Sequence, residues 1–202
     1  MRAFLVLSLS LWAVPAGAVG VLGFDHARPL EPGRIEAGLG VAAGDEVFDF
    51  QGIGRFGLLA DLEAGARAAV AVVGGDLDQT GFEVEGNAKF RFLRQQDTGD
   101  AVELAVMGSA SLLNTSDVFL FGVDPAAVAS HHFRITDDRE LYLSASLGLA
   151  VTFIDTGGTD TAFGFLGSFA AGVDIIPKVQ FALEATLRDD LKRFGVAVTY
   201  LF

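Results

Sequence analysis

Apolar and polar residues alternate along almost the whole chain, and this period of two constrains the fold more than any other feature. The alternation is clearest in segment 82–92, where Phe82 and Phe90 share one parity while Glu85 and Lys89 share the other. Successive side chains of a β-strand point to opposite faces of the sheet. Each such segment therefore predicts a strand with one apolar face and one polar face.

The pattern predicts an all-β fold with about ten antiparallel strands and no second domain. The expected strands are 35–41, 48–58, 63–72, 82–92, 102–112, 119–135, 141–153, 163–175, 179–187 and 193–202. Eight strands is the alternative, reached if the first or the sixth segment does not span. Pro125 lies inside the sixth segment and cannot donate a ladder hydrogen bond, so we expect a bulge or an extension beyond the sheet there.

The last ten residues form the most informative single strand. One face carries five apolar side chains, and the chain ends on one of them: Phe194, Val196, Val198, Tyr200 and Phe202. This strand resembles the closing strand of bacterial outer-membrane β-barrel proteins, which end on an aromatic-x-Phe sequence. The resemblance implies that Tyr200 and Phe202 form an assembly signal recognised by the barrel-assembly machinery, and that the fold is a transmembrane up-and-down barrel.

The connections between the expected strands alternate in length. Segments 136–139 and 176–178 are short turns, whereas 154–161 is a longer segment rich in Gly, Asp and Thr. Outer-membrane barrels have short turns on one side and longer loops on the other. We therefore expect the same asymmetry here.

The first 18 residues have the composition of a secretory signal peptide. Arg2 is the charged region, 3–14 is apolar, and Ala16-Gly17-Ala18 is a small-x-small cleavage site. Residues 19–33 contain two prolines and no clear period, so they predict an exposed periplasmic leader. The barrel domain is then 34–202.

Charge and cysteine content limit the possible partners. Residues 1–18 contain one base and no acid, so the mature chain has 13 bases against 26 acids, a net charge of −13. Nucleic acid is therefore not an expected partner. The chain has no Cys and, after the signal peptide, no apolar run long enough for a membrane helix. A membrane-spanning form must then be a closed barrel, with outer-membrane lipid around it.

Alternation alone does not decide which face is outside, because a soluble ligand-binding barrel has the same period with its apolar face inward. The polar parity mixes Gly, Ala and Ser with charges of both signs, which suits a crowded lumen better than a solvated surface. The lipid-facing assignment is therefore preferred. One feature departs from the family, whose aromatic girdles at the membrane interfaces are usually rich in Tyr and Trp. Here Tyr142 and Tyr200 are the only Tyr residues, and no Trp follows Trp12.

Few residues suggest catalytic or metal chemistry. Ser130 and His132 could form a dyad near Asp137 and Asp138, but their order matches no outer-membrane hydrolase or protease family. His131 and His132 are adjacent and point to opposite faces, which argues against a metal site. The loop acids match no calcium loop and predict a solvated surface: Asp45, Glu46, Asp76, Asp78, Asp155, Asp160, Asp189 and Asp190. No enzyme activity, metal or cofactor is expected.

The polar parity of segments 82–92 and 102–112 suggests a charge cluster in the lumen. The turn near Asp97 would place Arg91 almost opposite Glu103, with Lys89 and Glu85 on the same face. A lumen filled in this way predicts an envelope barrel with a structural or interaction role. A narrow ion or small-solute channel, with a preference for cations, is the alternative, and an enzyme or a secreted soluble barrel ranks lower. The sequence specifies no oligomeric state.

Overall fold

The computed structural model describes residues 26–44, 47–73, 79–99, 101–116, 118–137, 139–155, 159–188 and 191–202. The predicted signal peptide and the first part of the predicted leader lie outside these residues. Within the described part of the chain, no helix is long and apolar enough to cross a bilayer.

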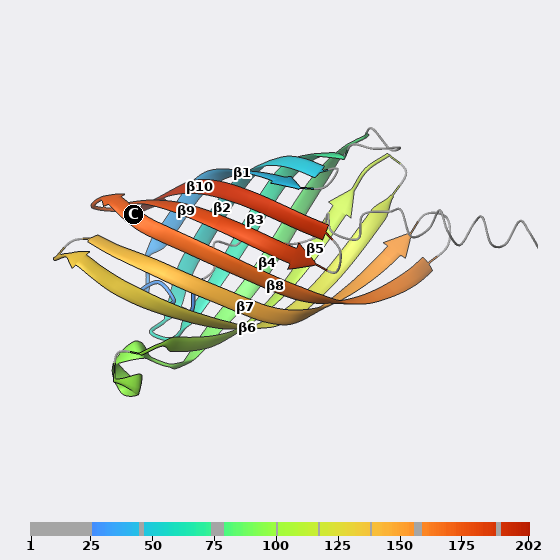
Figure 1. Ribbon diagram of the computed structural model, residues 1–202. Coiled ribbons are helices and arrows are strands. Elements are labelled where there is room, and N and C mark those ends of the chain that lie inside the picture. Colours follow the sequence, from blue (N-terminus) through green and yellow to red (C-terminus); the bar gives the residue numbers. More distant parts are fainter. Residues whose placement is uncertain are drawn as a thin grey trace, which may run out of the picture.

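Ten antiparallel strands form one closed barrel, as the alternation predicted (Figure 1). The strands are β1 (Ile35–Gly44), β2 (Val47–Leu59), β3 (Leu62–Val73), β4 (Gln79–Leu93), β5 (Glu103–Asn114), β6 (Phe119–Thr136), β7 (Arg139–Asp155), β8 (Thr159–Ile176), β9 (Val179–Arg188) and β10 (Leu191–Leu201). Each strand pairs with its neighbours in sequence, and β1 pairs with β10. The expected number of ten is confirmed, and a short 3-10 helix, η2 (Gln95–Thr98), lies between β4 and β5.

The last strand closes the barrel. The β1–β10 ladder runs from Glu36 opposite Leu201 to Gly44 opposite Arg193. The Phe202 N–H extends it by donating to the Ile35 carbonyl at 2.8 Å. We call the end of the barrel where β1 begins and β10 finishes the terminal end, and the other end the opposite end. Closure leaves no strand edge unpaired, which is the condition for a barrel that crosses lipid.

The outer surface is apolar and the interior is mainly polar. Outward side chains such as Phe163 and Phe194 are 79% and 64% exposed, whereas the inward Asp49 and Glu83 are wholly buried. The inside-out soluble alternative would require the reverse arrangement. The predicted apolar face of the last strand is likewise outside, with Phe202 60% exposed.

Tyr142 is a large inward-facing side chain rather than part of an outer aromatic girdle. It is 2% exposed and lies opposite Gly172 in the β7–β8 ladder. A Cβ atom on Gly172 would come within 2.1 Å of the Tyr142 ring. Glycine at this position is what makes room for the ring. Tyr200 is therefore the one described tyrosine on the outer surface.

The bulge expected at Pro125 is absent. β6 keeps one register through this position, since Val123 pairs with Val151 and Ala126 resumes pairing at Gly148. Pro125 itself lies opposite Gly108 of β5, and its side chain is exposed on the outer face. The ladder to β7 skips the proline, which has no N–H to donate, without shifting the strand.

The expected asymmetry of loop length is wrong. At the opposite end, β7 continues to Asp155 and pairs with Thr159 of β8, so the predicted loop 154–161 shortens to 156–158. The longest connection, 94–102, is instead at the terminal end, between β4 and β5. The sequence had suggested a loop where Gly, Asp and Thr cluster, but strand pairing includes residues 154, 155 and 159–161 of that segment. The turns predicted at 136–139 and 176–178 are confirmed.

Apolar side chains pack together inside the barrel at the opposite end, which the expectation of a charged and small-residue filling did not include. Leu120 of β6 lies opposite Leu113 on one side and Ile154 on the other. The cluster comprises Val47, Ala71, Leu113, Val118, Leu120 and Ile154. We call it the apolar closure.

Candidate functional site: the terminal vestibule

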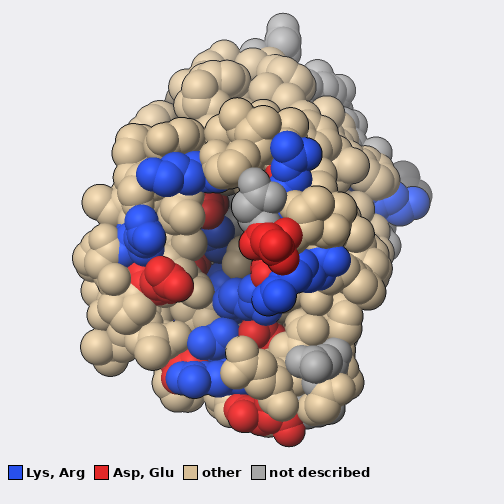
Figure 2. Space-filling view, turned by 90° about the vertical axis from the view of Figure 1, so that its left-hand side faces the viewer, with Lys and Arg blue, Asp and Glu red and all other residues tan. Residues whose placement is uncertain are grey.

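Charged side chains surround a hollow at the terminal end of the barrel (Figure 2). The predicted leader was expected to be exposed; this is confirmed for residues 31–33 and wrong for residues 26–30. Residues 26–30 lie inside the barrel, with His26 6% exposed and Ala27 wholly buried. We call residues 26–30 the strap, and the polar space around it the terminal vestibule.

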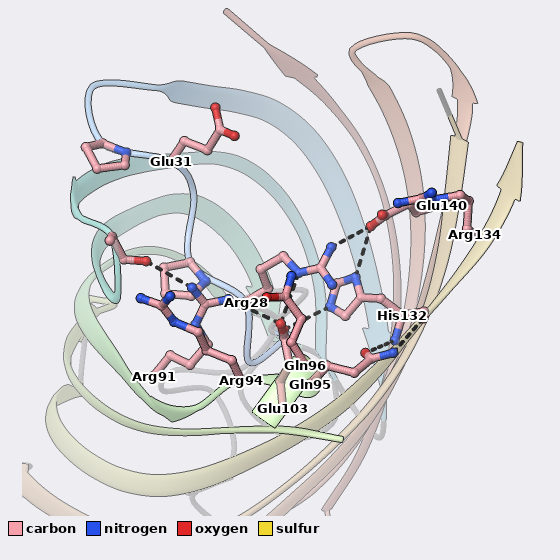
Figure 3. A pocket seen from close by; sticks show the side chains of 13 residues that line it. Arg28, Glu31, Arg91, Arg94, Gln95, Gln96, Glu103, His132, Arg134 and Glu140 are labelled. Atoms are coloured by element: carbon pink, nitrogen blue, oxygen red, sulfur yellow. Dashed lines mark hydrogen bonds and ion pairs between the residues drawn. The ribbon is translucent and has the colours of Figure 1, made fainter. Parts of the chain in front are cut away.

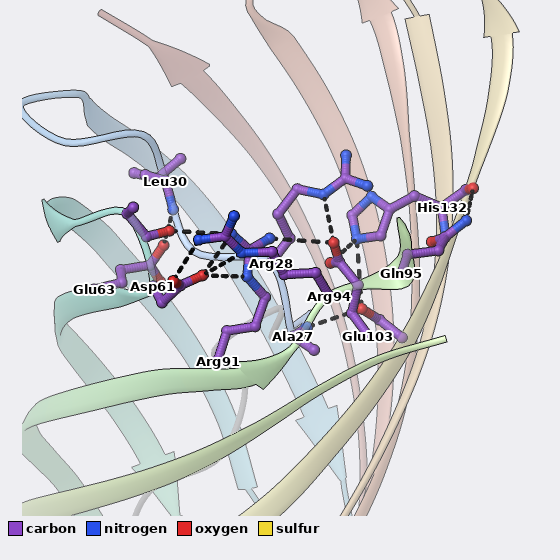
Figure 4. A network of polar contacts seen from close by, with 12 residues as sticks. Ala27, Arg28, Leu30, Asp61, Glu63, Arg91, Arg94, Gln95, Glu103 and His132 are labelled. Atoms are coloured by element: carbon purple, nitrogen blue, oxygen red, sulfur yellow. Dashed lines mark hydrogen bonds and ion pairs between the residues drawn. The ribbon is translucent and has the colours of Figure 1, made fainter. Parts of the chain in front are cut away.

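Two main-chain N–H groups of the strap donate to side chains on the barrel wall. Ala27 donates to Ser130 Oγ of β6 at 3.0 Å, and Leu30 donates to Glu63 Oε2 of β3 at 2.8 Å. These two strands lie on different sides of the strap in the network of polar contacts (Figure 4). The strap is therefore held across the vestibule and not along one wall.

Arg28 is the main ionic anchor of the strap. Its Nε lies 3.2 Å from Glu103 Oε1 of β5, and its Nη1 lies 2.7 Å from Glu140 Oε2 of β7. Glu103 is 3% exposed, whereas Glu140 lies nearer the mouth and is 39% exposed. One guanidinium therefore joins two strands that are not neighbours.

The strap divides the vestibule into two cavities. One, of about 720 Å³, extends toward η2 and is lined by Arg91, Arg94 and Gln96 among others (Figure 3). The other, of about 560 Å³, extends toward Lys178 and Thr199. Both cavities are lined by the same central residues: Arg28, Pro29, Glu31, His132 and Glu140.

His26 packs its ring among aromatic and cationic side chains at the deep end of the strap. The ring centroid lies 4.6 Å from that of Tyr142 and 5.1 Å from that of His132. Burial is the largest cause that lowers the pKa of His26 well below its ordinary value, and the nearby Arg55 charge adds to it. The ring is therefore neutral, and its Nε2 accepts from the Arg55 guanidinium at 3.4 Å.

A buried ion-pair network lies beside the strap. Glu63 Oε1 is 3.0 Å from Lys89 Nζ and 3.5 Å from Arg55 Nη1. Arg55 also pairs with Glu36 at 2.8 Å. Glu63 and Lys89 are each 1% exposed, so both charges depend on these partners instead of water.

A second, more exposed network holds the turn between β2 and β3. Asp61 accepts from Arg94 Nη2 at 2.6 Å and from Arg91 Nε at 2.9 Å. The hydrogen bond from Arg94 is the largest cause that holds the pKa of the Asp61 carboxyl below its ordinary value. This network connects the turn to the 94–102 connection.

Gln95 of η2 completes the wall where β6 extends beyond β5. Its amide oxygen accepts from the His132 N–H at 2.9 Å, and its amide nitrogen donates to the His132 carbonyl at 3.1 Å. The side chain therefore takes the place of a neighbouring strand at that residue. This contact fixes the main chain that carries His132 into the vestibule.

The structure brings together two of the four residues of the predicted charge cluster. Arg91 Nη1 lies 3.2 Å from Glu103 Oε1, as the turn geometry suggested. Lys89 pairs instead with Glu63 of β3, and Glu85 pairs with Arg67 of β3 at 3.3 Å. Sequence reasoning missed Arg28, Glu63 and Glu140; the only signal for Arg28 was a charged residue in a proline-restrained leader.

Ser130 and His132 are close but are engaged by structural contacts. Ser130 Oγ lies 3.4 Å from His132 Nε2, and His132 Nδ1 lies 3.4 Å from Glu140 Oε2. Ser130 is 3% exposed, accepts from the strap, and lines neither of the two cavities. Its hydroxyl is thus covered by Ala27 instead of facing a space for substrate. Asp137 lines the smaller cavity, and Asp138 lies outside the described residues.

Further ion pairs fill the middle of the lumen. Arg188 of β9 reaches Asp124 of β6 at 3.3 Å and donates to Thr152 of β7 at 2.6 Å. Two other buried pairs are Arg67 with Glu83 and Arg193 with Asp49. Because β7 and β8 lie between β6 and β9, the Arg188–Asp124 pair crosses part of the interior.

Among the described residues, no group of three or more His, Asp or Glu side chains could hold a metal ion. Asp155 and Asp160 lie at the opposite end, where they pair with Thr159 and Ile154 in the β7–β8 ladder. The other six loop acids considered above lie outside the described residues.

No family model matches the chain, and no curated protein matches it. Solved structures with a similar fold include a bacterial polysaccharide outer membrane secretin, with 12% identity and a TM-score of 0.49 over 86% of this chain and 67% of that one. The outer membrane enzyme PagL has 9% identity and a TM-score of 0.43. The KdgM porin has 11% identity and a TM-score of 0.42. Each covers 83% of this chain and 98% of its own. These likenesses do not bear on what this chain binds or does.

The architecture itself defines the class of protein. A closed barrel with an even number of antiparallel strands, an apolar outer surface and a polar interior is the arrangement of bacterial outer-membrane proteins. This chain has all of these features, including the outward Phe residues near both ends of the strands. It is a transmembrane β-barrel of the bacterial outer membrane.

Proposed function

We propose that this protein is a closed, non-conducting barrel with a structural or interaction role in the envelope. The observation that carries the proposal is the Arg188–Asp124 pair, which joins strands on different sides of the lumen with both side chains at most 3% exposed. The apolar closure lies between this pair and the opposite end of the barrel, and the strap lies between the pair and the terminal end. Ions would have to displace all three to pass.

Conductance across planar bilayers tests the proposal. The unmodified protein should give little or no steady current. Arg188→Ala combined with Leu120→Ala and Arg28→Ala removes the crossing pair, part of the apolar closure and the ionic anchor of the strap, so this variant should conduct. Large, steady single-channel currents from the unmodified protein would contradict the proposal.

A narrow channel is the second candidate, and the hollow at the terminal end favours it. The two cavities there have volumes of about 720 and 560 Å³. Selectivity for cations in the current of the unmodified protein would support this candidate, as the acidic net charge suggests.

We also propose that the barrel-assembly machinery recognises Tyr200 and Phe202. Both side chains are outward, 43% and 60% exposed, and their rings pack at a centroid distance of 4.8 Å. Phe202→Ala should keep the main-chain bond to Ile35 but leave exported protein unfolded in the periplasm. Phe194→Ala, on the same face, is the matched control. Normal amounts of folded Phe202→Ala barrel in the outer membrane would refute this role.

A further inference from the structure

We infer that the terminal vestibule is a binding site for an extended, arginine-bearing peptide segment, and that the strap occupies it as a releasable ligand in cis. The site is on the barrel wall, and the strap is only its present occupant. A partner segment with the same chemistry would bind in the same place.

The wall presents groups that match an extended cationic peptide. Glu103 and Glu140 take the two sides of the Arg28 guanidinium, at 3.2 and 2.7 Å. Ser130 Oγ and Glu63 Oε2 accept the N–H groups of Ala27 and Leu30, three residues apart. Charged and main-chain recognition together are what a peptide site requires, because they fix both the side chain and the direction of the chain.

The wall also has a shape that fits the strap. Gly57 of β2 faces inward, and a Cβ atom there would lie 2.1 Å from the Glu31 carbonyl oxygen and 2.7 Å from that of Leu30. Gly52 and Gly54 lie on the outward parity of the same strand and have nothing within 4 Å of an added Cβ. The barrel therefore has a glycine at the inward position where the peptide passes closest.

The strap can leave without disturbing the barrel. The polar contacts of residues 26–30 run to wall side chains, whereas main-chain bonding to β2 starts at Gly33 and Arg34. Gly33, with φ +81°, makes the turn between the strap and β1, and its N–H donates to the Gly57 carbonyl at 2.8 Å. Release therefore breaks side-chain contacts and keeps the ladder.

Cysteine labelling of the full chain tests release, because the protein has no native cysteine. Ala105→Cys places a thiol on the wall in the cluster that packs against Ala27, and Ala27→Cys places one on the strap itself. In folded barrels both thiols should react slowly with a water-soluble maleimide. Arg28→Ala and Gly57→Ala should each speed labelling at least tenfold, the first by removing the ionic anchor and the second by steric clash.

The matched controls separate docking from general loosening. Arg34→Ala removes a surface arginine paired with Glu31 at 3.6 Å, and Gly54→Ala adds a methyl group in open space on the same strand. Both should leave labelling within twofold of the parent. Heat-modifiable migration verifies that each variant is folded. Equal labelling of Arg28→Ala, Gly57→Ala and the parent, or fast labelling of the parent at both thiols, would overturn the strap as a releasable ligand.

Binding in trans is tested in the Arg28→Ala, Ala105→Cys barrel, which keeps the wall groups that would bind the peptide. The probe is the blocked pentapeptide of residues 26–30 at about 5 mM, comparable with the effective concentration of a short tether. It should slow labelling at least fivefold, whereas the same peptide with Ala in place of Arg should not. Protection by neither peptide, or by both equally, would overturn recognition of arginine. These outcomes do not depend on whether the barrel conducts.

Discussion

The two ends of the lumen are closed by different physical means. At the terminal end, charged wall residues such as Glu63 and Glu103 hold a segment of chain through ion pairs and hydrogen bonds. At the opposite end, side chains such as Leu120 and Ile154 meet without polar partners in the apolar closure. The first closure depends on charge and can be exchanged, whereas the second depends on volume and packing.

This difference shows that the inward-facing positions of a strand are not uniformly polar. The inward positions of β6 include Leu120 near one end, Asp124 in the middle and Ser130 near the other. A single strand thus contributes to packing, to an ion pair and to peptide binding at successive depths. Substitutions at the two ends should therefore have effects that differ in size and in cause.

The largest effect is expected from breaking the charged end. Glu63→Ala removes a buried carboxylate that pairs with both Lys89 and Arg55, so the free energy of unfolding should fall by about 3–5 kcal/mol. Glu31→Ala, an exposed acid at the same end, should change it by less than about 0.5 kcal/mol. Urea unfolding in lipid vesicles measures both. Equal costs would show that the buried network does not stabilise the barrel.

A somewhat smaller effect is expected from the apolar closure. Leu120→Ala should lower the free energy of unfolding by about 2–4 kcal/mol, because it leaves a cavity between Leu113 and Ile154. Leu120→Met keeps the volume and should cost less than about 1.5 kcal/mol. A loss for Leu120→Ala no larger than that for Leu120→Met would mean that packing does not close this end.

The third comparison is between two glycines of β8, one of which faces the Tyr142 ring. Gly172→Ala places a methyl group against the ring and should cost about 1–3 kcal/mol by overpacking. Gly167→Ala, also in β8, has its nearest neighbour at 3.8 Å and should be nearly neutral. Thermal unfolding of the two variants measures the difference. If both were neutral, Tyr142 would have to move freely beside His26.

The smallest effect is a dependence on pH at the mouth of the terminal end. The pKa of Asp61 is lowered from its ordinary 3.8 by Arg94 and Arg91, so folding favours the charged carboxylate. The stabilisation is present above the ordinary pKa and is lost as the pH falls through the lower folded value. Asp61→Asn should therefore reduce stability more at pH 6 than at pH 2. An equal loss at both pH values would argue against the ion pairs as its cause.

Much of the barrel could be predicted from the sequence. Alternation in segments such as 82–92 predicted ten strands and placed Phe90 outside and Lys89 inside, and the structure has both. The predictions that were wrong had been based on local residue composition instead of on the period of two. Pro125 suggested a bulge and 154–161 suggested a loop, but β6 keeps its register past Pro125 and pairing between β7 and β8 extends into both ends of 154–161.

The vestibule was only partly accessible from sequence. The contact between Arg91 and Glu103 could be anticipated because a single turn joins their strands. Partners from more distant strands could not be anticipated in the same way. Arg28 pairs with Glu103 of β5 and with Glu140 of β7. It can reach both only because barrel closure places these two strands on the same side of the lumen.

The sequence by itself determined which side chains face lipid and which face the lumen, because a period of two follows from the local geometry of each strand. Only the tertiary structure decided which lumen side chains meet, because barrel closure and strand register set their depth and their neighbours across the interior. The same holds for the strap. Residues 26–30 have no period to reveal them, and their place is fixed by a site that exists only after the barrel has closed.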